Sequence, residues 1–197
     1  HIEEGYDILI TKTDVDYILD AGSEAGRKLL DLLQNAEEAL DADIQKREEI
    51  WAKNRDALKK HSLTPALQEI PRLLEKAYDH TIWEEKAEKC FSCGSCNLVC
   101  PTCYCFDVAD DFSWDLKSGK RMRTWDGCML ENFAAVAGDH NFRKKKSERY
   151  RHRYYRKGKY VPEKIGEFAC VGCGRCISAC VARIANPVEI FNAVGEA

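Results

Sequence analysis

The sequence predicts a mainly α-helical fold. Apolar residues recur at three- and four-residue steps over residues 36–60, the pattern of an amphipathic helix. A second helical pattern begins near Pro65 and continues to Trp83. The strand-like runs that can be recognised lie in residues 7–20 and predict only a small hairpin. Two runs of four cysteines follow, and the segments that flank them are typical of helices rather than of paired strands.

The first predicted element is the hairpin, in which Asp7–Thr11 and Tyr17–Leu19 flank a polar turn. Two strands alone are only marginally stable, so the hairpin needs support from another part of the protein. Gly22 ends the strand pattern, and Ser23 is a good N-cap for a helix that we expect to reach Leu33.

The next predicted elements are two longer helical segments. In residues 36–60 one stripe carries mostly apolar residues, which favours packing over a cofactor role: Leu40, Ile44, Arg47, Trp51 and Leu58. Thr64 followed by Pro65 predicts the start of another helix, because proline is well suited to the first helical position. Pro71 then kinks or restarts that helix before the first cysteine run.

The two cysteine runs have the same spacing, C-x2-C-x2-C-x3-C, and occupy residues 90–100 and 170–180. This spacing is typical of ligands to [4Fe-4S] clusters, and two copies predict two clusters. A zinc site uses pairs of cysteines and leaves the third and fourth cysteine of each run unexplained. Complete cysteine ligation leaves no iron open to a substrate, so the runs indicate one-electron relay.

In two-cluster ferredoxins the fourth cysteine of each run serves the other cluster. Applied to this sequence, the pattern predicts that cluster one is held by Cys90, Cys93, Cys96 and Cys180. It predicts that cluster two is held by Cys170, Cys173, Cys176 and Cys100. Gly94 is expected to let the backbone approach the inorganic sulfides closely.

Three of the eleven cysteines, Cys103, Cys105 and Cys128, lie outside these runs and are expected to be free thiols. They are open to four interpretations: extra ligands, a redox pair, plain packing, or a nucleophile in a self-contained enzyme. Free thiols beside oxygen-labile clusters predict a reducing cytoplasm.

The segment from Arg143 to Lys159 is rich in lysine, arginine and tyrosine. Basic residues with interleaved aromatics can bind single-stranded nucleic acid. We favour an exposed helix whose charges balance the anionic clusters or meet an acidic partner. Arg175, inside the second run, is either a solvated loop residue or a side chain that slightly raises the potential of its cluster.

Composition sets limits on partners and domains. The 197 residues carry a formal net charge of -3, which argues against nucleic acid as the main partner, and no apolar run is long enough to span a membrane. We expect residues 1–62 to form an N-terminal hairpin and helical segment, the tail of a longer upstream region. Residues 63–197 are expected to form an α-helical ferredoxin-like dicluster domain with an insertion at 106–165.

The sequence also resembles a known family in five motifs that occur in the family's order. These are Cys100–Val108 (CPTCYCFDV), Trp125–Met129 (WDGCM), Phe133–Arg143 (FAAVAGDHNFR), Arg151–Tyr155 (RHRYY) and Cys170–Cys176 (CVGCGRC). They resemble the β subunit of cytoplasmic sulfhydrogenases and the corresponding iron–sulfur subunit of anaerobic sulfite reductases over about residues 86–197. In this sequence Val181, rather than proline, follows the last cysteine of the second run.

The resemblance implies an electron-transfer subunit with two [4Fe-4S] clusters in a hetero-oligomer. It implies a position between a flavin subunit that handles NAD(P)H and a catalytic subunit, either a nickel–iron hydrogenase or a sirohaem reductase. Related subunits also assemble with heterodisulfide-reductase-like or formate-dehydrogenase-like partners.

Overall fold

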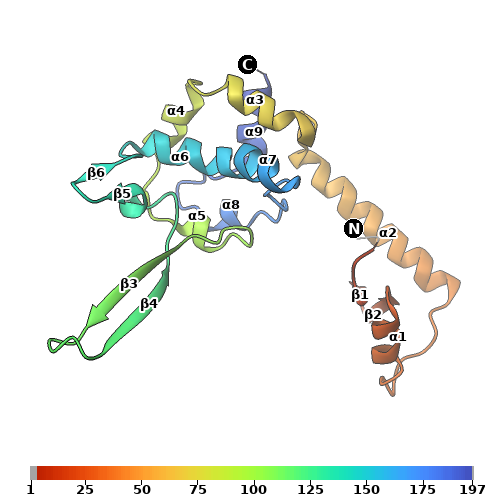
Figure 1. The fold of residues 1–197 in the computed structure, drawn as a ribbon. Coiled ribbons are helices and arrows are strands. Elements are labelled where there is room, and N and C mark those ends of the chain that lie inside the picture. Colours follow the sequence, from red (N-terminus) through yellow and green to blue (C-terminus); the bar gives the residue numbers. More distant parts are fainter. Residues whose placement is uncertain (1–3, 197) are drawn as a thin grey trace. The chain divides into compact units, whose positions relative to one another are not determined.

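The computed structural model describes residues 4–196 and divides into two compact units, the first ending at Ser62 and the second beginning at Leu63 (Figure 1). Residues 1–3 and 197, which belong to the predicted domains, lie outside the described residues.

The first unit opens with the predicted hairpin. Strand β1 (Ile8–Lys12) pairs antiparallel with β2 (Tyr17–Ala21). Ser23 accepts a hydrogen bond from the Gly26 N–H and caps α1 (Glu24–Leu30), so this helix ends three residues before the predicted Leu33. Helix α2 (Asp41–Leu58) follows, and the 3-10 turn η1 (Lys59–His61) ends the unit.

The support that the hairpin needs comes from α2. The indole N–H of Trp51 donates to Thr11 Oγ1 at 3.0 Å, and Arg47 pairs with Asp20 at 3.1 Å. No described residue of α2 is fully buried, and Leu58 at its end is exposed. The predicted stripe therefore packs against the hairpin only through its middle.

The second unit contains the cysteine runs and most of the helices. In chain order its helical elements are η2 (Leu67–Glu69), α3 (Ile70–Lys76), α4 (Ile82–Glu88), α5 (Ser95–Leu98), η3 (Glu131–Ala134), α6 (Lys146–Tyr155), the π-helical η4 (Arg156–Tyr160), α7 (Val161–Ile165), α8 (Arg175–Ala179) and α9 (Pro187–Gly195). The predicted helix start at Thr64 was wrong. The Glu69 carboxylate accepts from the Ala66 N–H, so a 3-10 turn forms there and α3 begins with Pro71 in its first turn.

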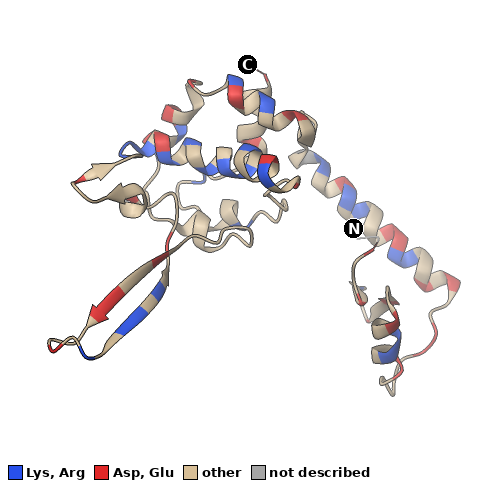
Figure 2. Cartoon of the chain, in the orientation of Figure 1, with Lys and Arg blue, Asp and Glu red and all other residues tan. Residues whose placement is uncertain are grey.

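The mainly α prediction holds only in part, because the insertion also contains β-structure. Strand β3 (Phe106–Phe112) pairs with β4 (Gly119–Trp125) in a long hairpin, and β5 (Ala135–Val136) pairs with β6 (His140–Asn141). Figure 2 shows acidic residues along β3 and basic residues along β4. Asp110 and Arg121 face each other across the strands. Asp-rich segments disfavour strands, and this cross-strand pairing offsets that preference.

The core of the second unit surrounds α6. Tyr150, Tyr154 and Tyr155 are buried there, and Tyr154 packs edge-on against Phe191 of α9 with ring centroids 5.9 Å apart. Trp83 of α4 packs on the same tyrosines. The prediction of an exposed basic helix was therefore wrong for this face, because α6 is a central helix. Its tyrosines cannot act as a surface for stacking nucleic-acid bases, which removes the basis of that alternative.

Candidate metal centre

The two cysteine loops adopt the same backbone conformation. In each loop two residues lie in the left-handed region: Ser92 (φ 54°) and Gly94 (72°) in the first, Gly172 (65°) and Gly174 (71°) in the second. A short helix then follows, α5 or α8, and these two helices pack against each other (Figure 1). The repeated spacing thus produces a repeated fold, and it brings the third cysteines of both runs to one interface.

Gly94 provides a test of this loop geometry. A Cβ atom at position 94 would lie 2.9 Å from the Leu130 side chain, whereas one at Gly174 would meet nothing within 4 Å. Both substitutions force alanine into the left-handed region, at about 1–2 kcal/mol, but only Gly94→Ala adds a steric conflict, worth about 1–3 kcal/mol. We expect Gly94→Ala to lower the iron content of the protein more than its matched control, Gly174→Ala. Equal iron contents in the two variants would contradict the role assigned to Leu130.

Both runs end in the same kind of turn. The Cys103 N–H donates to the Cys100 carbonyl at 3.2 Å, and the Arg183 N–H donates to the Cys180 carbonyl at 2.9 Å. Pro101 follows Cys100, but Val181 follows Cys180. The path after the last cysteine is therefore kept without proline.

The fourth cysteine of the second run lies with the first three of the first run. A cavity of about 390 Å³ is lined by four thiols: Cys90, Cys93, Cys96 and Cys180. Met129, Tyr150 and Ile184 supply part of its wall. We call these four thiols the first cysteine group. The cavity has the donor set that a [4Fe-4S] cubane requires.

Electrostatics place the remaining thiols in a second cysteine group. Burial raises the pKa of Cys176, Arg153 lowers it, and the thiols of Cys170 and Cys100 raise it further, so these groups are neighbours. By the same measure, burial raises the pKa of Cys96 to about 11, Arg153 acts against burial, and Cys128, Cys180 and Cys90 act with it. We define the second group as Cys170, Cys173, Cys176 and Cys100. Among residues 4–196 no three potential ligands converge closely enough to hold a single metal ion.

A row of buried cations runs along the α6 face that meets these loops. Arg149, Arg153 and Lys157 are only 2%, 1% and 3% exposed, and each lies four residues from the next. None of them forms a carboxylate ion pair within the described part of the chain, and the Nε atoms of Arg149 and Arg153 lack hydrogen-bond partners there. Buried charges require compensation. Cubanes held by thiolates carry net negative charge, so the surroundings fit the predicted clusters.

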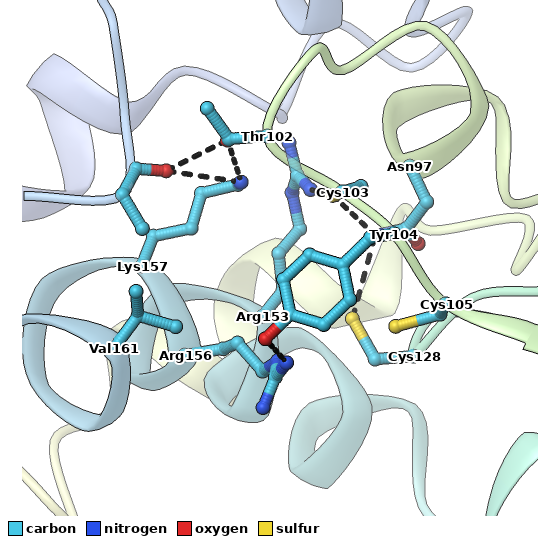
Figure 3. A pocket seen from close by; sticks show the side chains of 11 residues that line it. Asn97, Thr102, Cys103, Tyr104, Cys105, Cys128, Arg153, Arg156, Lys157 and Val161 are labelled. Atoms are coloured by element: carbon cyan, nitrogen blue, oxygen red, sulfur yellow. Dashed lines mark hydrogen bonds between the residues drawn. The ribbon is translucent and has the colours of Figure 1, made fainter. Parts of the chain in front are cut away.

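The three extra cysteines line a second cavity, shown in Figure 3. The buried Asn97 amide donates to the sulfurs of Cys128, at 3.4 Å, and Cys103, at 3.7 Å. A hydrogen bond from the Cys103 thiol to Cys100 lowers the pKa of Cys100 and raises that of Cys103. Cys103 is thus in direct contact with a predicted ligand, and Cys128 is packed inside the core. All eleven cysteines, each of them described, are free of disulfide bonds.

Comparison with known proteins agrees with this geometry. Residues 89–184 match the family model of the 4Fe-4S dicluster domain. This segment of the chain belongs to the 4Fe-4S dicluster family. The dicluster domain accounts for two [4Fe-4S] clusters, as the repeated cysteine run predicted.

A curated relative extends the similarity beyond the dicluster domain. Over 194 residues the chain is 36% identical to sulfhydrogenase 2 subunit beta of Pyrococcus furiosus, which confirms the resemblance identified from the motifs. The match covers 98% of this chain and 56% of the relative, so the chain spans little more than half of that protein. No solved structure matches.

Sequence reasoning missed the most buried polar residue near the cysteine groups. It singled out Arg175, which is exposed, and treated Arg153 as part of a surface helix. The spacing of four between Arg149, Arg153 and Lys157, in register with Tyr150 and Tyr154, was the available indication that one helix face is buried. Within the described residues, no helix has both the length and the apolar character needed to cross a bilayer.

Proposed function

We propose that this chain is an iron–sulfur electron-transfer subunit of a multi-subunit oxidoreductase. Cluster one is held by the first cysteine group and cluster two by the second. The observation that carries the proposal is the cavity shared by Cys90, Cys93, Cys96 and Cys180. Four thiolates satisfy every iron corner of a cubane, so the bound clusters supply one-electron oxidation and reduction rather than substrate chemistry.

The protein's own contribution is position and potential. The packing of α5 against α8 holds the two cysteine groups side by side, which suits rapid electron exchange between them. The Ser92 N–H donates to the Cys90 sulfur at 3.4 Å, and the Thr102 hydroxyl lies 3.4 Å from the Cys100 sulfur. Hydrogen bonds to sulfur and nearby charge are the means by which proteins set cluster potentials.

The partners follow from the relative rather than from the fold. Because the relative is the β subunit of a sulfhydrogenase, we propose a hetero-oligomer with two neighbours for this chain. One is a flavin subunit that handles NAD(P)H, and the other is a catalytic subunit of hydrogenase or sulfite-reductase type. A cytoplasmic location stays a prediction.

The test is reconstitution of the full chain with iron and sulfide under argon. We expect about eight irons per chain and a [4Fe-4S] signal in electron paramagnetic resonance (EPR) after reduction. Two zinc ions per chain, or an iron content near four, would contradict the two-cluster assignment. Purification from the native source then tests the partners, which should copurify as flavin-containing and catalytic subunits.

A further inference from the structure

Arg153 lies between the two cysteine groups. The side chain is 1% exposed, and its Nη1 is 3.9 Å from the Cys103 sulfur. Its charge acts on Cys96 of the first group and on Cys176 of the second, and it also hydrogen-bonds Cys176. Arg153 also lines the cavity of Figure 3. No hydrogen-bond acceptor reaches its Nε among residues 4–196.

The other two buried cations each lie beside one loop. Arg149 donates to Ser92 Oγ at 3.0 Å, inside the first cysteine run. Lys157 donates to Thr102 Oγ1 at 2.8 Å and to the Ala169 carbonyl at 3.2 Å, next to Cys100 and Cys170 of the second group. Positions four residues apart share one helix face, so the row crosses from one group to the other with Arg153 in the middle.

A buried cation next to a cluster stabilises the added electron and so raises the reduction potential. The effect is strong where water is excluded, because the effective dielectric constant is low. A cation that lies between two clusters acts on both, whereas one that lies beyond either cluster acts mainly on its neighbour. Without a carboxylate partner, the charge of Arg153 is not cancelled locally.

We propose that Arg153 is a shared electrostatic residue that raises the potentials of both clusters together, with Arg149 acting on cluster one and Lys157 on cluster two. This inference rests on the proposed electron-transfer function. Its consequence is that the two potentials stay matched, so that an electron passes between the clusters without a large step in energy.

The experiment measures both midpoint potentials by EPR-monitored redox titration of the full reconstituted chain. The variants are Arg153→Met, Arg149→Met and Lys157→Met, with Arg153→Lys as the charge-retaining control. Serine substitution of Cys93 or of Cys173, one exposed cysteine from each group, assigns each potential to its cluster.

We expect Arg153→Met to lower both potentials, each by at least a tenfold change in the ratio of reduced to oxidised cluster at fixed potential, or about 59 mV for one electron. Arg153→Lys should retain most of both potentials. Arg149→Met should lower only the potential of cluster one, and Lys157→Met only that of cluster two.

The proposal is overturned if Arg153→Met shifts one potential or neither, or if Arg153→Lys shifts both as much as Arg153→Met does. If Arg153→Met takes up less iron, retention of about eight irons in Arg153→Lys supports a need for charge, and loss in both variants overturns it. Failure of the proposed function is seen separately, in the iron content of the unmodified chain.

Discussion

Replacing Cys180 by alanine should remove the cluster held by the first cysteine run and leave the other in place. Cys180 lines the same cavity as Cys90, Cys93 and Cys96, although 80 or more residues of chain separate it from each of them. A cubane with three thiolates is labile and prone to loss. We expect iron to fall from about eight to about four per chain, measured by metal analysis after anaerobic desalting.

Double substitutions show which cluster is lost. If Cys180 and Cys93 serve one cluster, the double variant Cys180→Ala/Cys93→Ala should keep about as much iron as either single variant, about four per chain. The matched control, Cys180→Ala/Cys173→Ala, should lose both clusters. The reverse pattern would show that each run holds its own cluster. Cys100→Ala should behave as the mirror image, with Cys173 as its partner.

Removing iron should disrupt the packing of the second unit while leaving the first intact. Cys90, Cys96 and Cys180 pack against the core, and three cations are buried beside the cysteine groups. Leaving a buried charge without its partner costs about 3–5 kcal/mol, against a total stability of about 5–15 kcal/mol for a typical domain. We expect amide hydrogen exchange in α6 to accelerate strongly after chelation, and exchange in α2 to change little.

A variant separates the loss of charge compensation from the loss of cluster volume. In the iron-free protein, Arg153→Met removes a buried unpaired charge, so it should be more stable than the unmodified iron-free chain. In the iron-loaded protein the same substitution removes a favourable interaction and should destabilise. Denaturant titrations of both forms measure the two effects, and the same sign in both forms would contradict this account of the buried cations.

Cluster chemistry could be predicted from local spacing alone. The eight predicted ligands follow from two copies of C-x2-C-x2-C-x3-C, and the spacing within each run is a local property of the chain. The hairpin at β1 and β2 and the Ser23 cap were predictable for the same reason, since both depend on residues close in sequence. The start of α3 was not, because Glu69 competes with Thr64 for the capping role.

The environment of the clusters depended on contacts distant in sequence. The basic stretch at α6 has the composition of a solvated helix, and only the packing of α3, α4 and α9 around it buries Arg153 and its neighbours. The β3–β4 hairpin was missed because the acidic strip at β3 disfavours a strand until the basic β4 pairs with it. The amino-acid order determined which atoms bind iron, since ligand spacing is set along the chain. The tertiary structure decided which cations surround them, since burial is a property of what the rest of the chain places on top.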